Sequence, residues 1–106
     1  MKTAAILGAS ADSAKFGHKA VLAYALQGYT VWPVNPKESH IAGHPAYRDI
    51  ASLPGRPEVI SAYLPPPILL GILPIIAQRG CDELWLNPGT DSLVVVAEAQ
   101  RLGLSS

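Results

Sequence analysis

The feature that most constrains this chain is a short apolar run near its start that ends abruptly at a glycine. Residues 3–7 read Thr-Ala-Ala-Ile-Leu, and Gly8 and a segment of small and polar residues follow them. A strand that is apolar on both faces is typical of a parallel sheet with helices on both sides. The run therefore predicts an α/β fold with a buried first strand.

The rest of the chain alternates between segments of helical and of strand character. Helices are expected at residues 16–27, 65–79 and 92–103. Strands are expected at residues 29–34, 58–64 and 82–86. Between them, the Pro- and Gly-rich residues 35–57 allow at most a short helical turn near residues 47–53. This alternation predicts a three-layer Rossmann-like parallel sheet, and right-handed crossovers favour the strand order 3-2-1-4.

Two positions in this pattern are ambiguous. Residues 93–96 read Leu-Val-Val-Val and suit a strand, but a cap at Asp91 or Ser92 and a closing Gly103 favour a helix. Pro33 lies inside the second strand, which indicates that no neighbouring strand needs a hydrogen bond from its nitrogen.

Charge and cysteine content exclude several classes of function. Eight Lys and Arg residues balance eight Asp and Glu residues, so no net positive field favours nucleic acid. Cys81 is the only cysteine, which excludes an internal disulfide framework and a Cys-rich zinc site. His40 and His44 have zinc-like spacing, but no third ligand is near them in the sequence. We expect a single cytoplasmic domain over residues 1–106, without a metal site or a membrane span.

The candidate ligand site is a set of segments that follow the predicted strands, because ligands bind at the carboxyl ends of parallel strands. The first segment turns at Gly8 into a helix start, which suits a pyrophosphate, although small residues are equally typical of any such α/β turn. Valine in place of Gly8 is expected to block the ligand and leave the fold largely intact. The candidate contacts of this segment are Gly8, Ala9, Ser10, Lys15, Phe16 and Gly17.

The second segment, Asn35-Pro36-Lys37, carries a cation where an NAD-binding domain usually carries an acidic residue. Lys37 therefore suits a phosphorylated ribose, either the 3′-phosphate of coenzyme A or the 2′-phosphate of NADP. The third segment supplies Leu64 and Pro65 as a rigid apolar wall. The fourth supplies Pro88 and Gly89 in another glycine turn before a helix.

In order and spacing, these segments resemble the stand-alone CoA-binding protein family. The similarity is carried by residues 8–10, 28–29, 33–37 and 84–89, and residues 63–67 are also similar to the matching segment of the succinyl-CoA synthetase α subunit. The resemblance implies that coenzyme A or an acyl-CoA places its phosphates on the loop of residues 8–17. It implies that the adenosine and its 3′-phosphate lie near Asn35, Pro36 and Lys37, with Leu64 and Pro65 beside the adenine or the pantetheine.

The chain also departs from this family. Ser13 stands near a position where the family usually has proline, and Pro74 interrupts a helix that is normally continuous. The family's final strand would follow Leu104, so the resemblance implies a sheet without that strand. The outer edge of residues 82–86 would then be free to pair with a second copy of the chain.

No group of residues resembles a catalytic constellation, so we expect a binding module rather than an enzyme. Two alternatives remain. One is a protein that binds NADP or another nucleotide, because a cation after the second strand suits either phosphate. The other is an interaction module that has kept the fold and lost the ligand.

Overall fold

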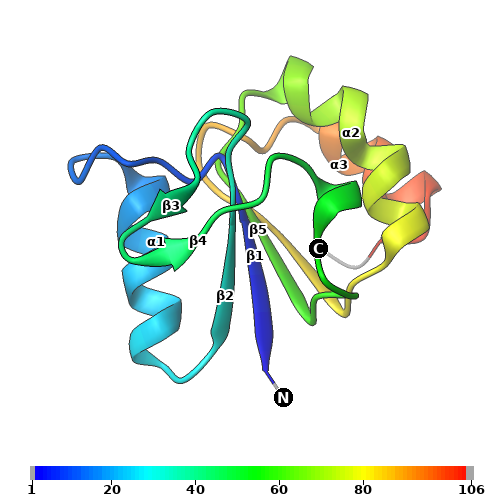
Figure 1. The fold of residues 1–106 in the computed structure, drawn as a ribbon. Helices are drawn as coiled ribbons and strands as arrows, with labels where there is room; N and C mark the ends of the chain where they lie inside the picture. The colour runs from blue at the N-terminus through cyan, green and yellow to red at the C-terminus, as the bar shows by residue number, and fades with distance from the viewer. Residues whose placement is uncertain (1, 105–106) are drawn as a thin grey trace.

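β1 (Thr3–Leu7) is buried along its whole length, as its apolar sequence predicts. The computed structural model describes residues 2–104 of the chain. β1 pairs in parallel with β2 (Thr30–Val34) on one side and with β5 (Val59–Ala62) on the other, and β6 (Glu83–Leu86) pairs with β5. The four-stranded sheet therefore has the order β2-β1-β5-β6 (Figure 1).

This order corrects the expected order 3-2-1-4, because the third predicted strand, β5, lies beside β1 and not beside β2. The outer edge of β2 is already occupied. Tyr47 N–H donates to the carbonyl oxygen of Pro33 at 2.8 Å, and Asn35 N–H donates to the carbonyl oxygen of Tyr47 at 2.9 Å. Pro33 itself has no N–H to offer, so another strand could not pair along this edge. The prediction that no strand needs the nitrogen of Pro33 is confirmed.

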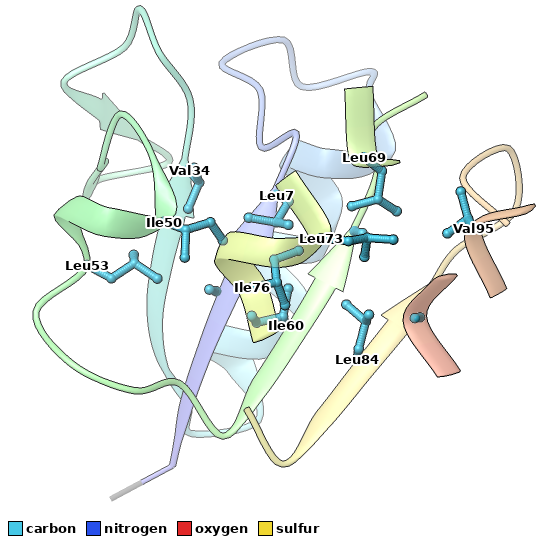
Figure 2. Close-up of a cluster of buried hydrophobic side chains, with 13 residues drawn as sticks. Leu7, Val34, Ile50, Leu53, Ile60, Leu69, Leu73, Ile76, Leu84 and Val95 are labelled. Carbon is cyan, nitrogen blue, oxygen red and sulfur yellow. The ribbon is translucent and has the colours of Figure 1, made fainter. Parts of the chain in front are cut away.

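Helices cover both faces of the sheet, which confirms the three-layer Rossmann-like architecture. α1 (Phe16–Leu26) packs on one face, and α2 (Pro66–Arg79) and α3 (Leu93–Arg101) lie on the other (Figure 1). A hydrophobic core lies on each face of the sheet, and alternate residues of β1 contribute to one or the other. Ala4 and Ile6 face α1, whereas Ala5 and Leu7 face α2. Figure 2 shows the larger core, to which α2 contributes Leu69, Leu73 and Ile76.

The segment between β2 and β5 contains a small hairpin that the sequence analysis missed. β3 (His40–Ile41) and β4 (His44–Pro45) pair antiparallel, and Ala42 and Gly43 turn between them with φ of 51° and 82°. An alanine is a weak signal for such a turn, because residues other than glycine rarely adopt positive φ. The expected helical turn is present as a short 3-10 helix, η1 (Ile50–Ser52).

The remaining ambiguities are settled by local hydrogen bonds and by helix continuity. Residues 93–96 are helical, and the hydroxyl of Ser92 accepts from Val95 N–H at 3.1 Å as the expected cap. α2 continues through Pro74 to Arg79 without a break. Within residues 2–104, no three metal-binding side chains gather, and no helix is both long and apolar enough to cross a membrane.

Candidate functional site

A cavity of about 690 Å³ opens at the carboxyl ends of β1, β2 and β5. It lies at the point where the chain changes direction across the sheet, since α1 connects β1 to β2 on one face and α2 follows β5 on the other. The predicted site residues that line it are Gly8, Ala9, Ser10, Lys15, Asn35, Pro36, Leu64 and Pro65.

A second hollow of about 280 Å³ adjoins the first on the side toward β6. The two share Gly8, Lys15, Tyr63, Leu64 and Pro65. The second hollow adds four further predicted residues: Phe16, Gly17, Pro88 and Gly89. The structure thus brings three of the four predicted segments fully together, and the junction of the hollows lies at the glycine turn after β1.

Lys37 is the predicted residue that lines neither hollow. It is exposed and follows Pro36, which does line the large cavity. Its backbone N–H donates to the side-chain oxygen Oδ1 of Asn35 at 2.8 Å. Lys37 therefore lies at the rim of the large cavity and outside its lining.

Two glycines allow α1 to begin directly against the turn after β1. Gly8 has φ of +79°, and a Cβ atom there would lie 2.9 Å from the carbonyl oxygen of Tyr63. A Cβ atom on Gly17 would overlap the carbonyl oxygen of Gly8. Both positions therefore need glycine for the fold itself. The expectation that valine at position 8 would spare the fold is wrong, because β1 and β5 meet too closely there.

The loop between these glycines is held by hydrogen bonds to its carbonyl oxygens. The side-chain amide of Asn35 donates to Ala9 O at 2.9 Å, and the Nδ1–H of His18 donates to Ser10 O at 2.9 Å. Lys15 N–H donates to Asp12 O at 3.0 Å. These bonds engage oxygens that would repel an anion, and they hold the loop in a defined shape.

Of the three α-helices, α1 has the start best suited to an anion. No side chain caps it, and its first turn contains no acidic residue. α2 instead begins with Pro66 and Pro67, which have no N–H groups, and the first turn of α3 is capped by Ser92. The free N–H groups of Phe16 and Gly17 lie beside the smaller hollow, next to Lys15.

The sequence analysis missed the outer wall of the large cavity, which η1 and the residues before it provide. Arg48 lines this wall, and its side chain is 80% exposed. Its only charged partner among the described residues is Asp49, at 3.7 Å between Nε and Oδ2. Asp49 is itself engaged, because the hydroxyl and the N–H of Ser52 donate to it and hold the pKa of its carboxyl below the usual range. Most of the Arg48 donors therefore have no charged partner among the described residues.

The opposite wall comes from α2 and was missed as well. Ile68, Ile72 and Ile75 line the cavity at a spacing of four and then three residues, beside the stripe that packs in the core. This second apolar stripe was the signal in the sequence that could have indicated a cavity wall. A helix that packs against the core with one face needs a single apolar stripe. The cavity thus combines an apolar wall with a cationic rim.

Thr90 is a further residue that the sequence analysis did not single out. Its hydroxyl donates to the carbonyl oxygen of Leu64 at 2.7 Å, and the residue is buried beside the smaller hollow. It ties the turn after β6 to the end of β5. Cys81, by contrast, lines neither hollow, and burial raises the pKa of its thiol. A partly buried thiol with a raised pKa is typical of a packing residue rather than of a nucleophile.

Similar solved structures share this fold over almost the whole chain. A conserved hypothetical protein from Pyrococcus furiosus matches with a TM-score of 0.90 and 30% identity, over 99% of this chain and 90% of that chain. A protein from Thermus thermophilus matches with a TM-score of 0.89 and 26% identity, over 98% and 79% of the two chains. The dinucleotide-forming acetyl-coenzyme A synthetase 1 of Ca. Korarchaeum cryptofilum matches at 0.77 and 24% identity, over 97% of this chain and 24% of that chain, which shows the fold alone.

Sequence comparison identifies the family. A curated trans-feruloyl-CoA synthase, FCS1, from an unknown prokaryotic organism is 30% identical over 86 residues. The match includes 78% of this chain but only 12% of that protein, so the chain spans a small part of this relative. A family model described as the CoA binding domain matches residues 2–105. The chain therefore belongs to the CoA binding domain family.

Proposed function

We propose that this protein binds coenzyme A or an acyl-CoA across the two adjoining hollows. The observation that carries the proposal is their junction, where the glycine turn after β1 and the uncapped start of α1 lie between a large and a small hollow. A ligand with a central pyrophosphate and two arms of different chemistry suits this arrangement. Membership of the CoA binding domain family supports the same ligand.

The pyrophosphate is assigned to the junction. Free N–H groups at a helix start, together with the positive end of the helix dipole, favour an anion. Lys15 lines both hollows and supplies a full positive charge there. The loop carbonyl oxygens are already engaged by His18 and Asn35, so they do not oppose the ligand.

The 3′-phosphoadenosine is assigned to the large cavity, because this hollow combines apolar walls with cations. Ile68 and Ile72 provide a surface for the adenine, and Arg48 provides a planar donor group for a phosphate. Lys37 at the rim is a second candidate for that phosphate. The uncharged pantetheine then follows the smaller hollow past Pro88 and Gly89.

Calorimetric titration of coenzyme A tests the proposal, with an Ile68→Asp variant and a matched Leu26→Asp control. Ile68 lines the large cavity and is 55% exposed in the first turn of α2, where a carboxylate is tolerated. Leu26 is 90% exposed and lines neither hollow. We expect Ile68→Asp to weaken binding at least about tenfold, through repulsion of the phosphates, and Leu26→Asp to leave it unchanged.

Three outcomes would contradict the proposal. The first is that the unaltered protein does not bind coenzyme A. The second is that Ile68→Asp binds it as tightly as the unaltered protein does. The third is that NADP binds more tightly than coenzyme A, which would favour the NADP alternative, since a cation beside the site suits either phosphate.

A further inference from the structure

Asp49 is the one acidic residue among the described residues that line the large cavity. Its side chain is 53% exposed, and the pKa of its carboxyl lies below the usual range because Ser52 donates hydrogen bonds to it. Asp49 is therefore ionised at neutral pH. A carboxylate near a phosphate weakens its binding through charge repulsion. The presence of Asp49 in a cavity assigned to a phosphorylated nucleotide therefore indicates a ligand group that a carboxylate can bind.

The two oxygens of this carboxylate have different surroundings. Oδ1 accepts from the N–H of Ser52 at 2.9 Å and from its hydroxyl at 2.5 Å, so it anchors the side chain to η1. Oδ2 accepts no hydrogen bond from the described residues, because the 3.7 Å between it and Nε of Arg48 is too long for one. A carboxylate oxygen only accepts. Oδ2 is therefore a held acceptor that suits a donor on the ligand.

Other groups that line the large cavity do not offer this chemistry. The carbonyl oxygens of Ala9 and Ser10 already accept hydrogen bonds from side chains of the protein. The charged side chains of the lining are Lys15 and Arg48, which only donate, and Asp49, which only accepts. A ligand that suits all three carries anionic groups together with a hydroxyl or another donor.

Arg48 and Asp49 place a donor and an acceptor side by side at the outer wall of the cavity. A ribose with a phosphate next to a free hydroxyl presents the complementary pair on neighbouring carbon atoms. In NAD-binding domains, an acidic residue after the second strand accepts the ribose hydroxyls. That position holds no acidic residue here, since residues 35–37 read Asn-Pro-Lys. Asp49 instead brings a carboxylate to the same cavity from the segment before η1.

We propose that Asp49 determines which ribose the large cavity accepts. Its Oδ2 accepts a hydrogen bond from the ribose hydroxyl beside the phosphate, while Arg48 binds that phosphate. In coenzyme A this hydroxyl is the 2′-hydroxyl, next to the 3′-phosphate. This role of Asp49 rests on the proposed function, in which the 3′-phosphoadenosine occupies the large cavity. It adds a requirement for a free hydroxyl, which repulsion between Asp49 and a phosphate would not produce.

Calorimetry with two nucleotides tests this role: adenosine 3′,5′-bisphosphate, which is the nucleotide half of coenzyme A, and its 2′-deoxy analogue. We expect the unaltered protein to bind the ribonucleotide about tenfold more tightly, because the deoxy form lacks a hydrogen bond to a charged group. Asp49→Ser keeps a side-chain cap for η1 but is too short to reach the ligand, so the preference should disappear. Glu38→Ala removes an exposed carboxylate outside both hollows, and as the matched control it should keep the preference.

A parallel titration of coenzyme A separates this role from the proposed function. If coenzyme A binds but the unaltered protein binds neither nucleotide, or binds both equally, the role of Asp49 is overturned and the proposed function stands. If Asp49→Ser tightens the binding of both nucleotides by the same factor and keeps their ratio, Asp49 acts only by repelling phosphate, which also overturns the role. If coenzyme A itself does not bind, the proposed function fails and this role fails with it.

Discussion

The side-chain amide of Asn35 donates a hydrogen bond of 2.9 Å to the carbonyl oxygen of Ala9 and so joins two loops that follow neighbouring strands. The oxygen Oδ1 of the same side chain accepts from Lys37 N–H at 2.8 Å and from Glu38 N–H at 3.1 Å. One side chain thus shapes both the loop after β1 and the loop after β2. Its polar atoms are engaged within the protein, so in the proposed site its role is to hold these loops in position.

Asn35→Ala is therefore expected to reduce both stability and ligand affinity. The loss of these partly buried hydrogen bonds should lower the free energy of unfolding by about 1–2 kcal/mol. Chemical denaturation measures this effect, and calorimetry should show weaker coenzyme A binding. Glu38→Ala, an exposed neighbour whose side chain makes no hydrogen bond among the described residues, is the control and should change neither quantity. Normal stability in Asn35→Ala would show that the two loops are held in some other way.

Gly17→Ala should destabilise the protein, because its Cβ atom would overlap the carbonyl oxygen of Gly8. Relief of the overlap requires α1 to move away from the sheet, and we expect a cost of about 1–3 kcal/mol, as for overpacked cores. Gly71→Ala in α2 is the matched control, since no atom lies within 4 Å of its added Cβ. Alanine favours a helix interior, so Gly71→Ala should raise stability by about 1 kcal/mol. Thermal unfolding of both variants gives the comparison, and equal effects would contradict it.

Arg48→Ala should reduce the preference of the protein for coenzyme A over dephospho-CoA. A charge-assisted hydrogen bond to phosphate contributes about 1.5–3 kcal/mol, and exposure of Arg48 to water lowers this. We expect the affinity ratio of the two ligands to fall about fivefold to tenfold.

Lys37→Ala should have a smaller effect on the same ratio, because Lys37 lies at the rim and outside the cavity lining. Lys2→Ala, at the other end of β1, is the control and should have none. If Lys37→Ala alone abolished the preference, the 3′-phosphate would be held by the loop after β2, as the family resemblance implies.

Arg79→Ala should loosen the outer wall of the cavity without removing any residue that lines it. Arg79 ends α2, and its guanidinium donates to the carbonyl oxygens of Leu53 and, at 3.3 Å, of Ala51. Faster hydrogen exchange at the amides of Ser52 and Leu53 in the ligand-free protein would show the loosening. Arg101→Ala is the matched control, because Arg101 ends α3 and its side chain pairs with Glu98 on the surface. Unchanged exchange in Arg79→Ala would show that packing of Ile50 and Leu53 alone holds the wall.

The cap of η1 should weaken on acidification. Ser52 donates two hydrogen bonds to the Asp49 carboxylate, which lowers the pKa of Asp49 in the folded protein. The contribution of this cap to stability is therefore complete above the unfolded-state pKa of about 4. It is lost as the pH falls through the lower folded-state pKa. The NMR shift of the Ser52 amide should follow this titration, and in Asp49→Asn the shift should not titrate in that range.

The local elements and the broad architecture could be predicted because they depend on neighbouring residues. The apolar run of β1, the glycine after it and the Ser92 cap each act within a few residues of the chain. The alternation of strand and helix then leads to a parallel sheet whose loops gather at the carboxyl ends of the strands. Three of the four predicted segments accordingly meet at the two hollows.

The strand order, the cavity wall and the function of single side chains were decided only by the tertiary structure. β5 pairs with β1 because Tyr47 and Pro33 block the edge of β2, a contact between residues 14 positions apart that no periodicity reveals. Arg48 lines the cavity only because η1, which follows it, packs against α2. The side chain of Asn35 donates a hydrogen bond to Ala9 O, 26 residues before it in the sequence. Sequence patterns report which faces of an element are apolar. They do not report which backbone groups are already hydrogen-bonded to residues far away in the sequence. Here those hydrogen bonds determine the shape of the site.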